Sequence, residues 1–165
     1  MTLETDGIRG VTKNYGARKT DMKWGGRTDT DALIKLSSWT FDYNDLPDAA
    51  NHNLGQSIPA GSTIVSARMR IITAFTSTSG TTDLLVGLEQ ADGTVIDADG
   101  LIAAAQATQT AIGTAGNMVT GAGALVGVSI GANAGELVVA PNVADLTAGR
   151  AEVLVEYMIP AALPA

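Results

Sequence analysis

Few residues in this chain of 165 could carry out chemistry, since it has one histidine and no cysteine. A catalytic triad would have to use His52 as its base, and we expect His52 to lie in a solvated polar loop over residues 48–57. The lack of cysteine excludes disulfides and thiolate metal sites. The phosphate-binding motif Gly-x-x-x-x-Gly-Lys-Ser/Thr and the zinc motif His-Glu-x-x-His are both absent. We therefore expect no enzyme, no metal site and no cofactor.

Two further patterns only partly match known ligand-binding loops. Asp92, Asp97 and Asp99 stand near glycines, as in a calcium loop, but the full loop with its terminal glutamate is absent. Turn formation explains these aspartates more simply. Residues 121–127 are glycine-rich like a dinucleotide-binding loop, but the glycine spacing differs by one residue and the sequence then alternates like a strand. Neither pattern predicts a site.

Positive charge is concentrated at the start of the chain. Residues 1–35 hold seven Lys and Arg residues against five acids, a net charge of +2, whereas residues 36–165 hold three against twelve, a net charge of −9. This division predicts an extended basic N-terminal arm over residues 1–35 and a β-sandwich body over residues 36–165. The acidic body argues against binding of nucleic acid, because phosphate would be repelled.

Residues 1–35 show neither helical nor strand periodicity, and glycines interrupt each short apolar group. One interpretation is a disordered tail. The other is an arm that orders on a partner, with an aromatic anchor and cations that steer association. The residues that we expect to bind the partner are Arg9, Lys13, Arg18, Lys19, Lys23, Trp24 and Arg27.

Alternating apolar and polar residues predict about eight short strands in the body. In the strongest of them, residues 63–76, we expect Val65, Ala67, Met69 and Ile71 to share one face. A short helix is predicted over residues 101–107, and turns at 77–82, 91–93 and 147–149. The other predicted strands include residues 37–43, 84–89, 94–96, 124–130, 136–140 and 151–159.

Charges on two of these strands suggest how they pair. Glu152 and Glu156 alternate with apolar residues in the last strand, as Arg68 and Arg70 do in the strand over residues 63–76. If the two strands are neighbours, the acids would lie across from the arginines and help to fix the register. Eight strands separated by short turns, with one short helix, predict an all-β sandwich of jelly-roll type.

Residues 100–135 contain no charged side chain. A membrane span is a poor explanation, because no continuous apolar stretch of about 20 residues occurs. The run is either ordinary core or partly a contact with an identical subunit, where interface cores are depleted of charge, and the two can coexist. The first residues also lack the basic and apolar regions of a signal peptide, so we expect a protein made in the cytoplasm.

Several stretches of the body resemble a known family of virion proteins. Residues 58–70, 72–76, 87–101 and 148–157 resemble small virion proteins of tailed bacteriophages, the capsid decoration or cement proteins. The resemblance covers residues 46–157 and rests on strand-and-turn phrases rather than on catalytic motifs. The arm is not clearly matched.

The resemblance implies a β-sandwich or jelly-roll body, often trimeric, on the outer surface of the capsid. Such a protein binds neighbouring major capsid proteins and holds the head against the pressure of packaged DNA. The arm would then bind the capsid, and part of the uncharged run would form the trimer interface. The interface residues that we expect are Leu101, Ile102, Ile112, Met118 and Val119.

A different function remains possible for a β-sandwich with an attachment peptide. It could bind carbohydrate or a receptor as part of a phage fibre or tail tip, although sugar sites need exposed aromatic residues and this chain has only two Phe, three Tyr and two Trp. A small hydrolase is a more distant alternative, because no nucleophile and base form a visible pair.

Overall fold

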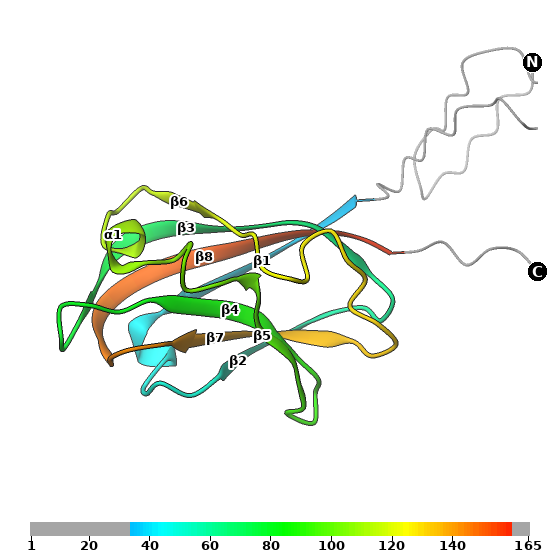
Figure 1. The fold of residues 1–165 in the computed structure, drawn as a ribbon, viewed down its shortest axis with the longest axis horizontal. Helices are drawn as coiled ribbons and strands as arrows, with labels where there is room; N and C mark the ends of the chain where they lie inside the picture. Colours follow the sequence, from blue (N-terminus) through cyan, green and yellow to red (C-terminus); the bar gives the residue numbers. More distant parts are fainter. Residues whose placement is uncertain (1–33, 160–165) are drawn as a thin grey trace, which may run out of the picture. The chain divides into compact units, whose positions relative to one another are not determined.

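Two four-stranded antiparallel sheets form the body in a computed structural model, which describes residues 34–159 (Figure 1). One sheet has the strand order β1-β8-β3-β6 and the other has the order β2-β7-β4-β5. A 3₁₀ turn, η1 (Tyr43–Asp45), follows β1, and the single described helix is α1 (Gln109–Ile112). The strands are β1 (Ile34–Asp42), β2 (His52–Ile58), β3 (Thr63–Ser77), β4 (Leu84–Glu89), β5 (Val95–Ile102), β6 (Met118–Thr120), β7 (Gly135–Pro141) and β8 (Leu146–Met158).

The order of the strands is that of a jelly roll. Each described strand is followed by a strand of the other sheet, except that β4 and β5 are neighbours in one sheet. Eight strands wound in this way into two packed sheets form the jelly roll found in viral capsid and lectin domains. The predicted all-β jelly-roll body with one short helix is therefore confirmed. The predicted arm lies outside the described residues, apart from Ile34 and Lys35, which begin β1.

The core lies between the sheets and depends on period-two alternation in the long central strands. In β8, Val153 and Val155 face inward and pair with Met69 and Ala67 of β3, and all four side chains are buried. Burial of such side chains stabilises the fold by about 1.5–3 kcal/mol each. The facing sheet contributes inward residues of β4 and β7 in the same way, namely Leu84, Val86, Leu88, Leu137 and Val139.

The outer face of β3 and β8 shows how the charged residues set the register. Arg70 lies opposite Glu152, and its Nη2 is 2.8 Å from a carboxylate oxygen of that residue. Arg68 lies opposite Leu154 rather than an acid. Glu156 instead accepts a hydrogen bond of 2.7 Å from Ser66. The expected pairing of the two strands is thus confirmed. Of the two arginines, Arg70 forms an ion pair with a described residue.

Two predicted elements in the uncharged run are wrong. The predicted helix over residues 101–107 is absent because Leu101 and Ile102 complete β5, where Ile102 pairs with Val86 of β4 and both residues are fully buried. Pairing and burial outweigh the helical propensity of the alanines that follow. Asp97 and Asp99 therefore lie in a strand, and the helix forms farther along as α1.

Residues 124–130 do not form the predicted strand. They make turns that contact β3 through two isolated bridges, from Val126 to Ile64 and from Ser129 to Thr63. Gly127 and Gly131 have φ of 85° and 87°, a conformation that a regular strand does not contain. Apolar alternation predicts burial here, and Ile130 is indeed buried, but the glycines prevent a ladder.

The predicted loop over residues 48–57 is wrong in its second half, where β2 begins at His52. The sequence does not indicate this strand, because the pairing of β2 with β7 is interrupted between Asn53 and Ser57. The alternation of apolar and polar residues is lost there. A similar irregularity between Ile64 and Ser66 turns Val65 outward, contrary to its expected place in the core face, while Ile64 is fully buried.

The predicted turn over residues 147–149 lies instead within β8. Gly149 has φ of 135° and sits where the pairing of β3 with β8 is irregular. A β-carbon at this position would collide with the ring of Phe75, which is fully buried. Glycine therefore marks a close approach inside a strand and not a chain reversal.

We expect Gly149→Ala to destabilise the body by about 3 kcal/mol, because it combines an unfavourable backbone conformation with overpacking against Phe75. Gly80→Ala is the matched control, since Gly80 also has positive φ (72°) but open space around it. The control should lose about 1 kcal/mol. Urea denaturation measures both, and equal losses would contradict the close packing of Gly149.

The ion pair between Arg70 and Glu152 generates a second prediction. Arg70→Glu should lower the free energy of unfolding by about 1 kcal/mol, because it places two acids opposite each other on a partly exposed face. The double reversal Arg70→Glu with Glu152→Arg should restore most of this loss. Arg68→Glu, opposite Leu154, should cost less. A double variant no more stable than Arg70→Glu would argue against the pairing.

Candidate functional site

The residues that the sequence predicts to bind a partner fall mostly outside the described part of the chain. All seven, from Arg9 to Arg27, precede residue 34. The five predicted interface residues are described, and four of them, Leu101, Ile102, Ile112 and Val119, are buried in the core of their own chain. Met118 on β6 is 46% exposed, so it is the one of the five that a neighbouring subunit could readily touch.

The uncharged run largely serves the core of its own chain. It supplies buried residues of β5, α1 and β6, and its amide side chains bind backbone groups nearby. The Gln109 side chain donates to the carbonyl of Phe75 at 3.0 Å, and Asn117 donates to the carbonyl of Ala111 at 2.8 Å. The sequence predicts that the uncharged run forms either ordinary core or partly a contact with an identical subunit. Its buried residues fit the first interpretation, because they pack within their own chain.

The ionisable residues that could suggest catalysis have structural roles. His52 is not a solvated loop residue, because it begins β2 and its Nε2 lies 3.1 Å from a carboxylate oxygen of Asp48. The backbone N–H of Thr94 donates to Asp92 and lowers the pKa of that carboxyl group. Burial, and secondarily the side chain of Asp99, raise the pKa of Asp97.

Two absences apply to the part of the chain that the structure describes. Between residues 34 and 159, no three His, Asp or Glu side chains are placed to hold a metal ion. The same residues contain no helix long and apolar enough to cross a membrane.

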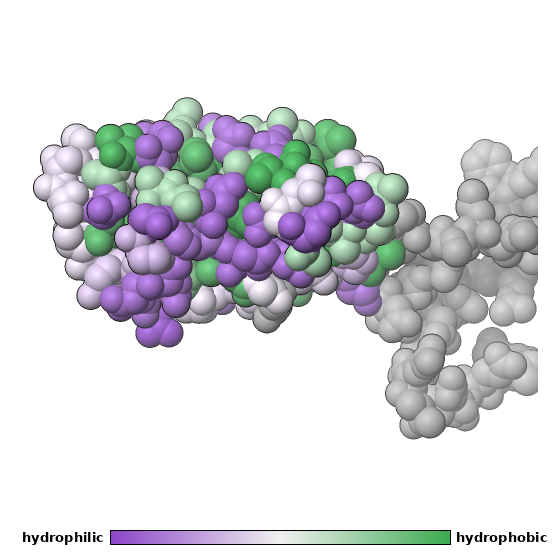
Figure 2. All heavy atoms as spheres, turned by 90° about the horizontal axis from the view of Figure 1, so that it is seen from below, coloured by the Kyte–Doolittle hydropathy of each residue, from purple (hydrophilic) through white to green (hydrophobic). Residues whose placement is uncertain are grey.

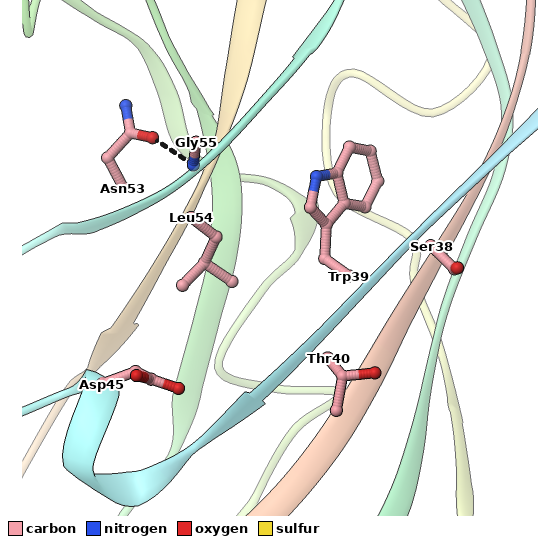
Figure 3. A pocket seen from close by; sticks show the side chains of 7 residues that line it. All are labelled: Ser38, Trp39, Thr40, Asp45, Asn53, Leu54 and Gly55. Carbon is pink, nitrogen blue, oxygen red and sulfur yellow. Dashed lines mark hydrogen bonds between the residues drawn. The ribbon is translucent and has the colours of Figure 1, made fainter.

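A cleft lies between β1 and β2, which sequence reasoning did not identify. Its volume is about 530 Å³, within the usual range for ligand pockets. Both strands are edges of their sheets, so the cleft lies on the side of the sandwich where these edges face each other. Seven residues from β1, η1 and β2 line it: Ser38, Trp39, Thr40, Asp45, Asn53, Leu54 and Gly55 (Figure 3).

The cleft is wide because β2 leaves its ladder with β7 beside it. Four residue steps separate Asn53 from Ser57 on β2, against two between their partners Val138 and Glu136 on β7. The extra length forms a bulge that contains Gly55, whose φ is 78° and whose N–H donates to the side chain of Asn53 at 2.6 Å. Such a bulge weakens the local pairing and bends the strand.

Trp39 borders the cleft from the side of β1. It is 4% exposed, and its indole Nε1 is buried without a hydrogen-bond partner. Figure 3 shows that this nitrogen lies on the edge of the ring that faces β2, where half-buried Leu54 stands across the cleft. An unpaired buried N–H costs about 1–3 kcal/mol, so the body contains an unsatisfied donor beside this cleft.

The carboxylate of Asp45 lines the cleft, and Asp42, Glu89 and Glu136 are hydrogen-bonded to lining residues. Asp45 accepts a hydrogen bond from the backbone N–H of Asp42, whose own side chain caps η1. On the other side, the amide of Asn53 donates to Glu89 at 2.8 Å and to Glu136 at 2.6 Å. None of these four acids, together called the acidic rim, forms an ion pair with a residue in the range 34–159.

The strands that build the cleft are partly predictable, but the cleft is not. The alternation of Trp39 and Phe41 predicts β1 and also the burial of both side chains. The bulge in β2 has no clear signal, since Asn53 and Gly55 are equally typical of a loop. A single tryptophan among small polar residues is the one sign that could have drawn attention to this edge.

The face of the body drawn in Figure 2 shows no broad apolar area. Seen from below relative to Figure 1, the body presents mainly hydrophilic residues with apolar ones in small groups (Figure 2). On the outer face of the β1-β8-β3-β6 sheet, a small groove of about 130 Å³ lies among Leu36, Arg68 and Met118. Obligate interfaces are typically larger and more apolar, so the face drawn in Figure 2 suits modest contacts.

Comparison with known proteins finds no matching family model and no matching curated protein. Among solved structures, a chain of the cyanophage Pam1 capsid asymmetric unit is similar, with 17% identity, a TM-score of 0.58, and coverage of 88% of this chain and 100% of that chain.

Two further similar chains belong to phage capsid structures. One is from the acidic stable capsid of Helicobacter pylori bacteriophage KHP30, at 16% identity and a TM-score of 0.52, covering 79% of this chain and 90% of that one. The other is from the capsid of Ralstonia phage GP4, at 18% identity and a TM-score of 0.52, covering 78% and 86%. At these identities the likeness shows the fold, and the body therefore shares its jelly-roll fold with chains of phage capsids.

Proposed function

We propose that this chain is a non-enzymatic structural protein of a tailed-phage virion. It binds the outer surface of the capsid, cements neighbouring major capsid proteins and stabilises the head against internal DNA pressure. The observation that carries the proposal is the shared fold, which extends over 78–88% of this chain in three separate phage capsid structures.

The basic arm is the proposed capsid-binding element. Its cations and Trp24 would contact acidic surfaces of adjacent capsid subunits, while the net −9 body would be repelled by them. Each contact is modest, but many copies on one lattice, each bridging two subunits, gain stability through effective concentration. A trimer would multiply this effect, and exposed Met118 is the described residue of the predicted interface that could contribute to it.

Binding of carbohydrate or a receptor is the weaker candidate, because the described aromatic residues offer no platform. Trp39, Phe41, Phe75 and Tyr157 are buried, and Tyr43 is half-buried. Sugar rings stack on exposed aromatic faces, so a site of this kind would need residues other than these.

The test uses phage particles produced without this chain, to which purified protein is added back. We expect the full chain to sediment with the particles and to raise the temperature at which they release DNA. Binding without any gain in capsid stability would contradict a cementing role. Failure to bind would contradict attachment to the capsid.

Deletion of residues 1–33 should leave the body folded but reduce capsid binding by at least about a hundredfold, because the multivalent contacts are lost. The deletion stops at residue 33 because Ile34 and Lys35 begin β1, where they pair with Met158 and Tyr157 of β8. A chain with the six arm cations changed to Gln is the matched control for charge. Co-sedimentation measures binding and circular dichroism measures folding. Undiminished binding by the shortened chain would exclude the arm as the capsid-binding element.

A further inference from the structure

The cleft between β1 and β2 has the backbone features of a site for an extended peptide. Within residues 34–159, β1 pairs only with β8, and β2 pairs only with β7. Their facing edges therefore carry backbone N–H and C=O groups without strand partners. Edges of this kind readily accept another strand, and main-chain hydrogen bonds supply much of the affinity.

Trp39 adds a specific donor to this site. Its indole N–H has no acceptor, it faces the cleft, and half-buried Leu54 of the β2 bulge stands opposite it (Figure 3). Leu54 lies in the interval between Asn53 and Ser57 where the ladder is interrupted, so a shift of Leu54 would break no strand pair. A carbonyl group of a docked peptide would then reach the N–H and satisfy it.

The charge of the rim selects a basic peptide. Asp42, Asp45, Glu89 and Glu136 line the cleft or bind its lining residues, and none forms an ion pair within the described chain. Residues 9–27 of the same sequence carry six cations and one acid, a net charge of +5. Opposite charges on a cleft and a segment favour their association and fix its specificity.

The length of chain before β1 allows this segment to come from another copy. Thirty-three residues precede Ile34, and fully extended they could span roughly 110 Å. The residues directly before β1 include Asp29 and Asp31, which the carboxylates of the chain's own cleft would repel. An arm that reaches the cleft from a neighbouring molecule need not bring its Asp29 and Asp31 beside these carboxylates.

We infer that the β1–β2 cleft binds a short part of residues 9–27 from a second copy of this chain. The docked segment lies along the free edge of β1, offers a carbonyl to the Trp39 N–H, and places its cations against the acidic rim. The lining part of β1 is only Ser38 to Thr40. Most of the cationic stretch thus stays available to other surfaces, and the exchange of arms does not depend on capsid attachment.

Disulfide trapping tests this exchange in the full chain, which has no cysteine of its own. Chains with Thr40→Cys, unlabelled, are mixed with ¹⁵N-labelled chains that carry Lys13→Cys, Lys19→Cys or Lys23→Cys, and cross-linked pairs are identified by mass spectrometry. We expect at least one arm position to form mixed pairs about tenfold faster than with Val143→Cys, the control on the exposed β7–β8 connection.

Two outcomes would overturn the inference. One is the absence of faster cross-linking at all three arm positions. The other is closure within one molecule, seen when Thr40→Cys and an arm cysteine in the same chain cross-link at high dilution while the mixed single variants do not. Neither outcome bears on binding to phage particles, so failure here is distinguishable from failure of the proposed function.

Trp39→Phe provides a second, independent readout in the full chain. It keeps an aromatic ring in the core but removes the N–H, which has no partner in the isolated body. We expect self-association, measured by sedimentation equilibrium, to weaken about fivefold through loss of one hydrogen bond. Because the smaller ring leaves a cavity in the core, we also expect a lower melting temperature, and circular dichroism checks that the variant is folded. Unchanged association would contradict the role assigned to the indole N–H, and Val143→Ser serves as the surface control.

Discussion

The pairing of β8 with β3 on one side and β1 on the other is the constraint on which the rest of the structure depends. It places the inward residues of the three strands opposite the second sheet and fixes which side chains can form the core. The Arg70–Glu152 ion pair and the Ser66–Glu156 hydrogen bond lie on its outer face, where a one-residue slip would separate both pairs. It also makes β1 an edge strand, and with it sets the position of Trp39.

The sequence predicts a strand well where apolar and polar residues alternate regularly along it. Alternation in β3, β4 and β8 reflects one buried face, so these strands and their pairing are predictable. The failures share another cause, which is irregular pairing. β2 is obscured by its bulge, Val65 is turned outward by another, and Gly149 resembles a turn residue because a buried ring requires glycine there. The cleft combines an edge strand with a bulge, so only tertiary structure reveals it.

The two sides of the sandwich differ in a way that links fold to function. On the side of β5 and β6, the uncharged run packs against the core and covers it with α1 and the turns around Gly127. On the side of β1 and β2, two strand edges and the carboxylate of Asp45 border a cleft, next to a buried donor without an acceptor. A body of this kind, joined to a cationic segment, is suited to repeated contacts of one type. Such contacts gain strength from the number of copies more than from the area of any single interface.

The number of copies in the virion tests this account most directly. Quantitative mass spectrometry of density-purified phage particles would give the ratio of this chain to the major capsid protein. The account predicts hundreds of copies per particle in a simple fixed ratio to the capsid subunit. A handful of copies would place the protein in the tail or a fibre, and its absence from the particles would contradict a virion role altogether.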